Sequence, residues 1–378
     1  MTRIESARLV AAQLGVLATL GALPDLPDGP RLDRAPTPVH DVNGELLLWR
    51  IGTCGGRGYV DIAAHPMMGA PLVAVAPEAA WDPEALLDEA RSRGVEHDEL
   101  LFVAYSFPKL AVRYLLGGVE VALLELHTWE PVPPVRADLT EPPGEFERWS
   151  LLDELSPEAR RAHDERYRQR MEALTHLADA LHVDEPVVRR FDRKIVEQVL
   201  RPRVEALELQ YSHRFADQSS CLGLLGQETS RWSAAASAQM VLDFYRYRYD
   251  QERLADELGL GTEENPTGLP ASRDFDVVRA LENLTGKSLT ASMSTSPTFA
   301  EHRSEIRANR PVISFVPGHC RVVTGYTRTS SLLLIGASFA ALRVADPWPP
   351  RAGVVTRWEN VDTIVCRNTV TAKVTLVP

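Results

Sequence analysis

The distribution of apolar and polar residues divides the chain into three segments. Between residues 41 and 130, short apolar runs alternate with Gly, Pro and polar residues, which predicts mixed α/β structure. The runs expected to be strands are Glu45–Ile51, Gly58–Ala64, Pro71–Ala76, Leu100–Tyr105 and a hairpin of Leu110–Leu116 with Val119–His127. Asp82-Pro83-Glu84 predicts a helix start and Gly94 its end, because Asp is a favoured N-cap and Pro a favoured first helical residue.

The second segment is heavily charged and has a helical pattern. A proline-rich linker at 131–144 precedes it, and the pattern then runs from Ser156 to about residue 215. Ser156-Pro157-Glu158 predicts one helix start and Asp184-Glu185-Pro186 a second, in a helix that Pro202 should kink or break. Apolar positions are too sparse for a long coiled coil, so we expect a helical connector between two domains.

From residue 216 onward, predicted helices come first and predicted strands follow. The helices are expected at Ser233–Arg248, Gln251–Leu258 and Phe275–Asn283, and the strands at Pro311–Val316, Arg321–Tyr326, Ser331–Ile335, Leu342–Ala345, Val354–Trp358 and Thr369–Val377. This order is typical of an α+β fold. We therefore expect an α/β-type N-terminal accessory domain at 1–140, a linker and helical connector at 141–215, and a third domain at 216–378.

The mostly apolar stretch at 9–23 has some features of a signal peptide. Gln13 interrupts it, Glu5 lies in the basic part before it, and no small-x-small cleavage site is clear. An amphipathic or buried helix explains the stretch better. No run reaches 18 apolar residues, so no membrane span is expected. We expect a cytoplasmic protein, with secretion as the alternative.

Composition and charge exclude several classes of function. Lys and Arg number 41 against 52 Asp and Glu, which argues against a nucleic-acid binder, because such a protein needs a basic face. The four cysteines are Cys54, Cys221, Cys320 and Cys366. They include no C-x-x-C pair, so neither a disulfide framework nor a structural zinc site is expected. We expect no metal and no cofactor.

Three short motifs carry candidate chemistry. Residues 227–240, QETSRWSAAASAQM, predict a helix with small residues in its early turns and Ser233 at its start, where unpaired N–H groups favour an anion. The sequence GHCRVVTG at 318–325 places His319 at the mouth of a strand. The sequence ADPWP at 345–349 places Asp346 at the end of another strand, with Trp348 two residues later.

In this order, the motifs resemble those of papain-like cysteine peptidases. They are most similar to the bacterial branch that includes bacteriocin-leader peptidases and a plant-pathogen effector protease. The resemblance covers residues 216–378 and implies a papain-like domain, in which a helical half precedes an antiparallel β half. It also implies a protein or peptide substrate.

The resemblance implies a role for each motif residue. Gln227 would be the oxyanion donor, Ser233 would occupy the nucleophile position, His319 would be the general base, and Asp346 would orient His319, while Trp232 and Trp348 would contact substrate or shield the site. In this arrangement the backbone N–H of residue 233 and the Gln227 amide donate to the oxyanion as it forms. The Asp346 carboxylate fixes the imidazole tautomer, and Trp348 covers the His–Asp pair.

Ser233 departs from the family pattern, which has cysteine there. A helix N-terminus beside an imidazolium acidifies a thiol, but it does not acidify a serine hydroxyl enough. We therefore expect a cysteine endopeptidase in an inactive or nearly inactive form. A Cys-to-Ser replacement introduced to stop self-digestion or trap a complex would explain Ser233, and intact Gln227, His319 and Asp346 favour it. The alternatives are a natural pseudoenzyme that binds peptides or partners, an acyltransferase or deamidase on the same fold, and a true serine hydrolase.

Each motif residue alone also has an ordinary structural explanation, such as a helix N-cap for Ser233, and only their joint order supports catalysis. Strand alternation turns Cys320 away from the face of His319, so Cys320 is expected to be buried, and Cys54 is expected in a turn. Residues 1–215 could occlude the cleft until cut at 131–144, or could recruit substrate. We favour recruitment, because a 215-residue segment is long for a plug.

Overall fold

The computed structural model describes residues 3–23, 26, 31–32, 35–53, 58–77, 79, 81–134, 148–153, 155–209, 225–351, 355–363 and 366–375. Its N-terminal elements are α1 (Arg3–Thr19), β1 (Thr37–Asp41), β2 (Leu46–Gly52), β3 (Tyr59–Ala63), η1 (Pro66–Met68), β4 (Leu72–Ala76), α2 (Pro83–Ser92), β5 (Glu99–Ser106), β6 (Lys109–Leu116) and β7 (Val119–Glu125). The middle elements are α3 (Pro157–Ala180), α4 (Arg193–Leu200) and β8 (Pro202–Glu208).

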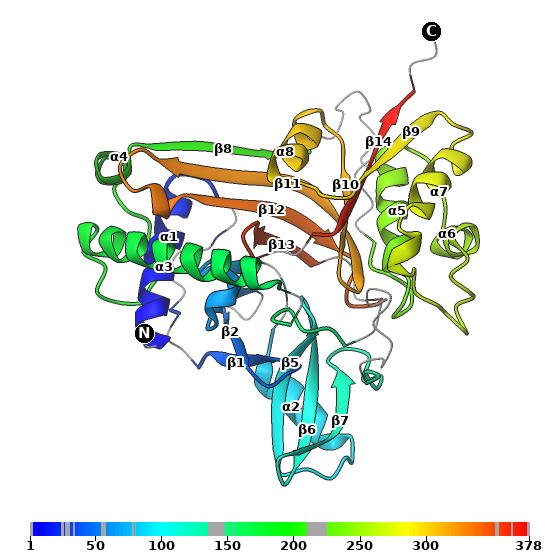
Figure 1. Ribbon diagram of the computed structural model, residues 1–378, viewed down its shortest axis with the longest axis horizontal. Coiled ribbons are helices and arrows are strands. Elements are labelled where there is room, and N and C mark those ends of the chain that lie inside the picture. The colour runs from blue at the N-terminus through cyan, green and yellow to red at the C-terminus, as the bar shows by residue number, and fades with distance from the viewer. Residues whose placement is uncertain are drawn as a thin grey trace.

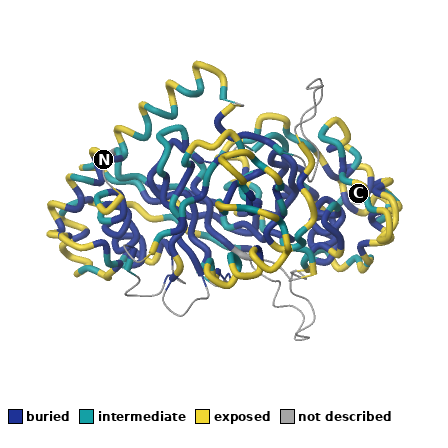
Figure 2. Tube along the Cα trace, turned by 90° about the horizontal axis from the view of Figure 1, so that it is seen from below, coloured by how far each residue is buried: buried dark blue, intermediate teal, exposed yellow. Residues whose placement is uncertain are grey.

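The C-terminal part carries helices first and then mostly strands (Figure 1). Its elements are α5 (Ser233–Phe244), α6 (Gln251–Leu258), η2 (Ala271–Arg273), α7 (Asp276–Leu284), β9 (Leu289–Ser294), α8 (Phe299–Arg307), β10 (Val312–Val316), β11 (His319–Ser331), η3 (Ile335–Ala337), β12 (Phe339–Asp346), β13 (Val355–Asn360) and β14 (Asn368–Val374). Figure 2 shows buried residues gathered in the interior and exposed residues along the outer edges.

A single hydrogen-bonded sheet links all 14 strands of the described residues. Its order is β7-β6-β5-β1-β2-β3-β4-β13-β12-β11-β10-β14-β9, and β8 pairs with β11. Neighbouring strands are antiparallel except β1 and β5, which are parallel. The sheet passes from the N-terminal to the C-terminal strands at β4 and β13, where Val75 lies opposite Trp358. The long β11 pairs with β10 at its start and with β8 at its end.

Helix α1 is buried on nearly all sides. One set of its apolar residues shares a core with strands from both ends of the chain, including Phe339 and Trp358, and a second set packs against α3 and α4. Each fully buried leucine stabilises such a core by about 1.5–3 kcal/mol. The prediction of a buried helix in this region is therefore confirmed. No helix of the described residues has the length and hydrophobicity needed to cross a membrane.

Most elements predicted between residues 41 and 130 are confirmed, with bounds that differ by one or two residues. Helix α2 begins after Asp82, whose carboxylate accepts hydrogen bonds from two backbone N–H groups of the first turn. Strands β6 and β7 form the predicted hairpin, which turns at Gly117-Gly118 with positive φ at both glycines. These elements follow from local signals, since caps and glycine turns act within a few residues.

The prediction for the connector is only partly correct. Helix α3 starts as predicted after Ser156, whose side chain caps the N–H of Ala159. Asp184-Glu185-Pro186 does not start a helix, because this segment bonds to the N-terminal part: the Pro186 carbonyl accepts from the N–H of Leu32. Helix α4 begins later, capped by the Asp192 side chain.

The predicted helix over residues 202–208 is wrong, because these residues form β8. Arg201 adopts a positive φ of 43° and ends α4, so Pro202 opens a strand rather than kinking a helix. Strand β8 then pairs with the distant second half of β11. The charged side chains that suggested a helix lie along a strand that, within the described part of the chain, pairs with β11 alone. Residues 135–147 of the predicted linker and 210–224 lie outside the described residues.

In the C-terminal part, helices come first and strands mostly follow, as predicted, except that β9 precedes α8. Helix α6 has the predicted bounds and ends at Gly259, which has a φ of 64°. The strand predicted at Ser331–Ile335 is wrong, because the Ser331 hydroxyl accepts hydrogen bonds from the N–H groups of Leu333 and Leu334 and turns the chain. Strand β9 and helix α8 were not predicted, although Thr298 and Glu301 form a capping box at the start of α8.

The domain division at 140 and 215 stays a prediction. The hydrogen bonds between β4 and β13 and between β8 and β11 cross the proposed boundaries and therefore bear on this division.

Candidate active site

Ser233 is the first residue of α5, as predicted. The small residues after it let the helix pack closely against the sheet, where Ala234 and Ala235 share a core with Cys320 and Val322. The Ser233 Oγ accepts a hydrogen bond of 3.0 Å from the backbone N–H of Cys320. This bond joins the start of α5 to the start of β11.

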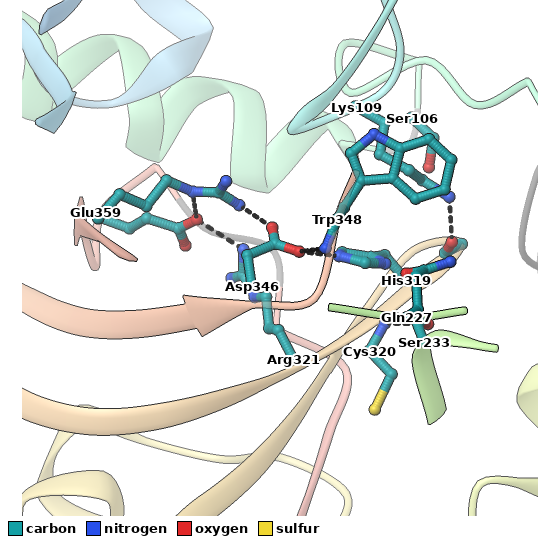
Figure 3. Close-up of polar contacts among 12 residues, drawn as sticks. Ser106, Lys109, Gln227, Ser233, His319, Cys320, Arg321, Asp346, Trp348 and Glu359 are labelled. Carbon is teal, nitrogen blue, oxygen red and sulfur yellow. Dashed lines mark hydrogen bonds and ion pairs between the residues drawn. The ribbon is translucent and has the colours of Figure 1, made fainter. Parts of the chain in front are cut away.

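His319 and Asp346 lie at the facing ends of two paired strands. His319 opens β11 and Asp346 closes β12. The His319 Nε2 and Asp346 Oδ1 atoms are 2.6 Å apart, and each side chain is 1% exposed. The His319 Nδ1 atom has no hydrogen-bond partner among the described residues. Figure 3 shows the ring between the Asp346 carboxylate and the start of α5, where Ser233 lies.

The Asp346 carboxylate belongs to a buried ion network. Its Oδ2 contacts Arg357 Nη2 at 2.5 Å, and Glu359 Oε1 accepts from Arg357 at 2.5 Å and from Arg321 at 2.7 Å. Burial alone would raise the pKa of Asp346, but the charges of His319 and Arg357 hold that pKa well below its ordinary value. Burial lowers the pKa of His319, which the Asp346 carboxylate opposes. Asp346 is therefore ionised at neutral pH and can orient the imidazole.

Gln227 and Trp348 lie close to this pair (Figure 3). The Gln227 N–H donates to the Pro347 carbonyl at 2.9 Å, and its Nε2 donates to the Thr229 carbonyl at 2.6 Å. The Trp348 ring meets the His319 ring nearly at a right angle, with centroids 6.3 Å apart. The structure thus brings Gln227, Ser233, His319, Asp346 and Trp348 to one place. Their catalytic roles stay predictions.

Trp232 was expected to contact substrate or shield the site, but it does not lie with these residues. Its side chain is fully buried in the core of the helical half, and its Nε1 donates to the Leu260 carbonyl at 3.0 Å. Trp232 is therefore a core residue, because the residue before the helix start packs inward. Cys320 is buried in the same core, which confirms its predicted burial. Cys54 and Cys221 lie outside the described residues.

The site also contains residues that the sequence did not indicate. Lys109 and Ser106, which flank the β5–β6 turn, donate to the carbonyls of Gly318 and Pro317 directly before His319. The contacting residues are about two hundred positions apart in the chain, so no local pattern could reveal the contacts. Arg357 and Glu359 were missed for a related reason, because only the pairing of β12 with β13 brings them to Asp346.

The candidate site is enclosed. Ser233, His319, Asp346 and Gln227 are each 3% exposed or less. The N-terminal part contacts the site at two places. Lys109 reaches the β10–β11 turn, and Glu130 accepts a hydrogen bond of 3.1 Å from Ser230 before α5. Among the described residues, no group of three His, Cys, Asp or Glu side chains could hold a metal ion.

Comparison with known proteins relates the same part of the chain to peptidases. Residues 222–367 match the model of the Peptidase_C39 like family. The comparison with curated proteins found no match. The matched residues include Gln227, Ser233, His319 and Asp346.

Two solved structures are also similar to this chain. One is a double glycine motif protease from an AMS/PCAT transporter in complex with the leader peptide, at 18% identity and a TM-score of 0.27, covering 42% of this chain and 96% of that one. The other is UfSP from C. elegans, at 12% identity and a TM-score of 0.24, covering 44% of this chain and 34% of that one.

Proposed function

We propose that residues 222–367 form the acyl-transfer site of a papain-like cysteine endopeptidase with Ser233 at the nucleophile position, and that its substrate is a protein or peptide. The observation that carries this proposal is the buried His319–Asp346 contact of 2.6 Å beside the start of α5. Because Asp346 occupies Nε2, the imidazole keeps Nδ1 for a nucleophile at the helix start. That nitrogen has no hydrogen-bond partner among the described residues.

With a thiol at position 233, each residue has a defined task. His319 Nδ1 takes the thiol proton, and the thiolate attacks the peptide carbonyl carbon. The N–H of residue 233 and the second Nε2 hydrogen of Gln227 donate to the oxyanion. The imidazolium then protonates the leaving amine, and water hydrolyses the thioester with His319 as base. Asp346 stabilises the imidazolium and keeps Nε2 protonated.

Serine at position 233 gives this site a weaker nucleophile. A serine hydroxyl stays protonated in surroundings that ionise a thiol, so we expect the chain as it stands to hydrolyse peptides slowly or not at all. The second candidate function is a papain-fold pseudoenzyme that binds peptides or partners. The Ser233 Oγ accepting from the Cys320 N–H, together with the enclosure of the site, favours it. Acyl transfer or deamidation would use the same residues.

The test is Ser233→Cys in the full chain. We expect a thiolate, detected by its ultraviolet absorbance, well below the ordinary thiol pKa of about 8.5. Adding His319→Ala should abolish it. Ser237→Cys, at a buried position one turn further along α5, serves as the matched control and should form no such thiolate. Iodoacetamide should label Cys at 233 faster than Cys320 or Cys366, since burial raises the pKa of Cys366.

The outcomes separate the candidates. Equal thiol behaviour at positions 233 and 237 would contradict the acyl-transfer site. A His319-dependent thiolate with cleavage of a fluorogenic peptide library supports the peptidase. The same thiolate without cleavage, but with transfer of an acyl group from a glutamine peptide to an added amine, supports the transferase.

A further inference from the structure

The β5–β6 turn of the N-terminal part lies directly on the β10–β11 turn that leads into His319. Ser106 Oγ donates to the Pro317 carbonyl at 3.0 Å, and Lys109 Nζ donates to the Gly318 carbonyl at 2.7 Å. Both donor residues are buried, Lys109 being 2% exposed. Gly318 has a φ of 64°, which glycine adopts readily. Two successive carbonyls before His319 thus accept hydrogen bonds from side chains about two hundred positions earlier in the chain.

Lys109 also reaches the ring beside the imidazole. Its Nζ lies 5.2 Å from the centroid of the Trp348 ring and 5.6 Å from that of Tyr105. Trp348 in turn packs against His319, so Lys109 contacts both the backbone before the histidine and the ring that covers it. In Figure 3 the Lys109 side chain overlaps the Trp348 ring, and a dashed line joins its Nζ to the Gly318 carbonyl beside His319. Burying an ammonium group is costly, so an apolar side chain would suit a purely packing role better.

Three charged groups on three strands act on the imidazole. Asp346 on β12 favours its protonation, whereas Lys109 on β6 and Arg321 on β11 oppose it. Arg321 is bonded to Glu359 within the ion network. Lys109 is the member of this set that the N-terminal part supplies.

We propose that Lys109 is a positioning residue of the active site: it fixes the Gly318–His319 backbone and Trp348 and sets the charge beside the imidazole. The N-terminal part then completes the site and is not a detachable cover. This inference rests on the proposed function, because it concerns the ion pair between His319 and a thiolate at position 233. If Lys109 has this role, removal of residues 1–140 should damage the site.

The experiment measures thiolate absorbance against pH in full-length Ser233→Cys protein. The ion pair exists between a lower pH limit, where the thiol ionises, and an upper limit, where the imidazolium loses its proton. Removing a nearby cation makes both groups hold their protons more tightly. Lys109→Met should therefore move both limits upward by about half a pH unit or more. Lys109→Arg should keep the limits of the parent, and Lys194→Met, the same change at an exposed position, should move neither.

Lys109→Gln covers the case in which Lys109→Met does not fold, because Gln keeps an N–H donor for the Gly318 carbonyl and lacks the charge. It should show the same upward shift. Unchanged pH limits in the folded neutral variants, with or without a smaller thiolate amplitude, would overturn the role of Lys109. That result differs from failure of the proposed function, in which Ser233→Cys shows no His319-dependent thiolate at all.

Discussion

The ion pair between Arg357 and Asp346 allows the energetics of the site to be measured. The two side chains are 6% and 1% exposed, and Arg357 also bonds to Glu359. Arg357→Met keeps the apolar stem and removes the charge, which leaves Asp346 without its cation. Breaking a buried pair from one side costs about 3–5 kcal/mol, so we expect a loss of that size in the free energy of unfolding.

Urea denaturation followed by tryptophan fluorescence measures this loss. The matched control is Arg343→Met on β12, because Arg343 pairs with Glu208 at 3.1 Å while both side chains are partly exposed. That pair should contribute about 0–1 kcal/mol. In a double-mutant cycle, Asp346→Asn should lower the cost of Arg357→Met by more than about 1 kcal/mol, since the uncompensated charge is then absent.

The pH dependence gives a second measurement. Asp346 has a pKa below its ordinary value, so its contribution to stability is present above about pH 4 and is lost only as the pH falls through the lowered folded-state pKa. Without Arg357 that pKa rises, so acid unfolding should occur at higher pH. A loss equal to that of Arg343→Met, together with an unchanged acid midpoint, would refute the reasoning.

Two further predictions concern stability. Burial raises the pKa of Asp274 to about 6, so the ionised carboxylate costs stability at neutral pH. Asp274→Asn should therefore raise the free energy of unfolding by about 3 kcal/mol at pH 7 and by less than about 1 kcal/mol near pH 4, and an equal gain at both pH values would contradict this. Gly15→Ala would place a Cβ 2.4 Å from the Arg189 carbonyl, so thermal and urea unfolding should show a loss of about 1–3 kcal/mol. A gain, as in an exposed helix, would show that α1 is not packed this way.

The sequence predicted those features whose cause lies within a few residues. The end of α6 at Gly259 and the start of α3 after Ser156 follow from caps that contact their own helix. The places of His319 and Asp346 at strand ends follow from short motifs, and the resemblance supplied the roles expected for them. These signals are local, so distant parts of the chain did not alter them.

The missed features depend on contacts between distant residues. Lys109 meets Gly318 across 209 positions, and nothing around Lys109 distinguishes it from a surface lysine of a hairpin. Residues 202–208 became a strand because β11 offered them an open edge, which outweighed the helical preference of their charged side chains. Trp232 was misplaced because its position beside Ser233 does not reveal which way the ring points.

The position of β13 between β4 and β12 affects how the protein can be synthesised. Strand β4 leaves the ribosome long before one of its two neighbours in the sheet, which is formed by Val355–Asn360. Until that segment emerges, β4 presents an unpaired edge that can bind other nascent chains. Pairings this distant in sequence also form slowly. Pairing of β4 is therefore completed only after Val355–Asn360 has been made, and ribosomes stalled before residue 355 should yield chains prone to aggregate.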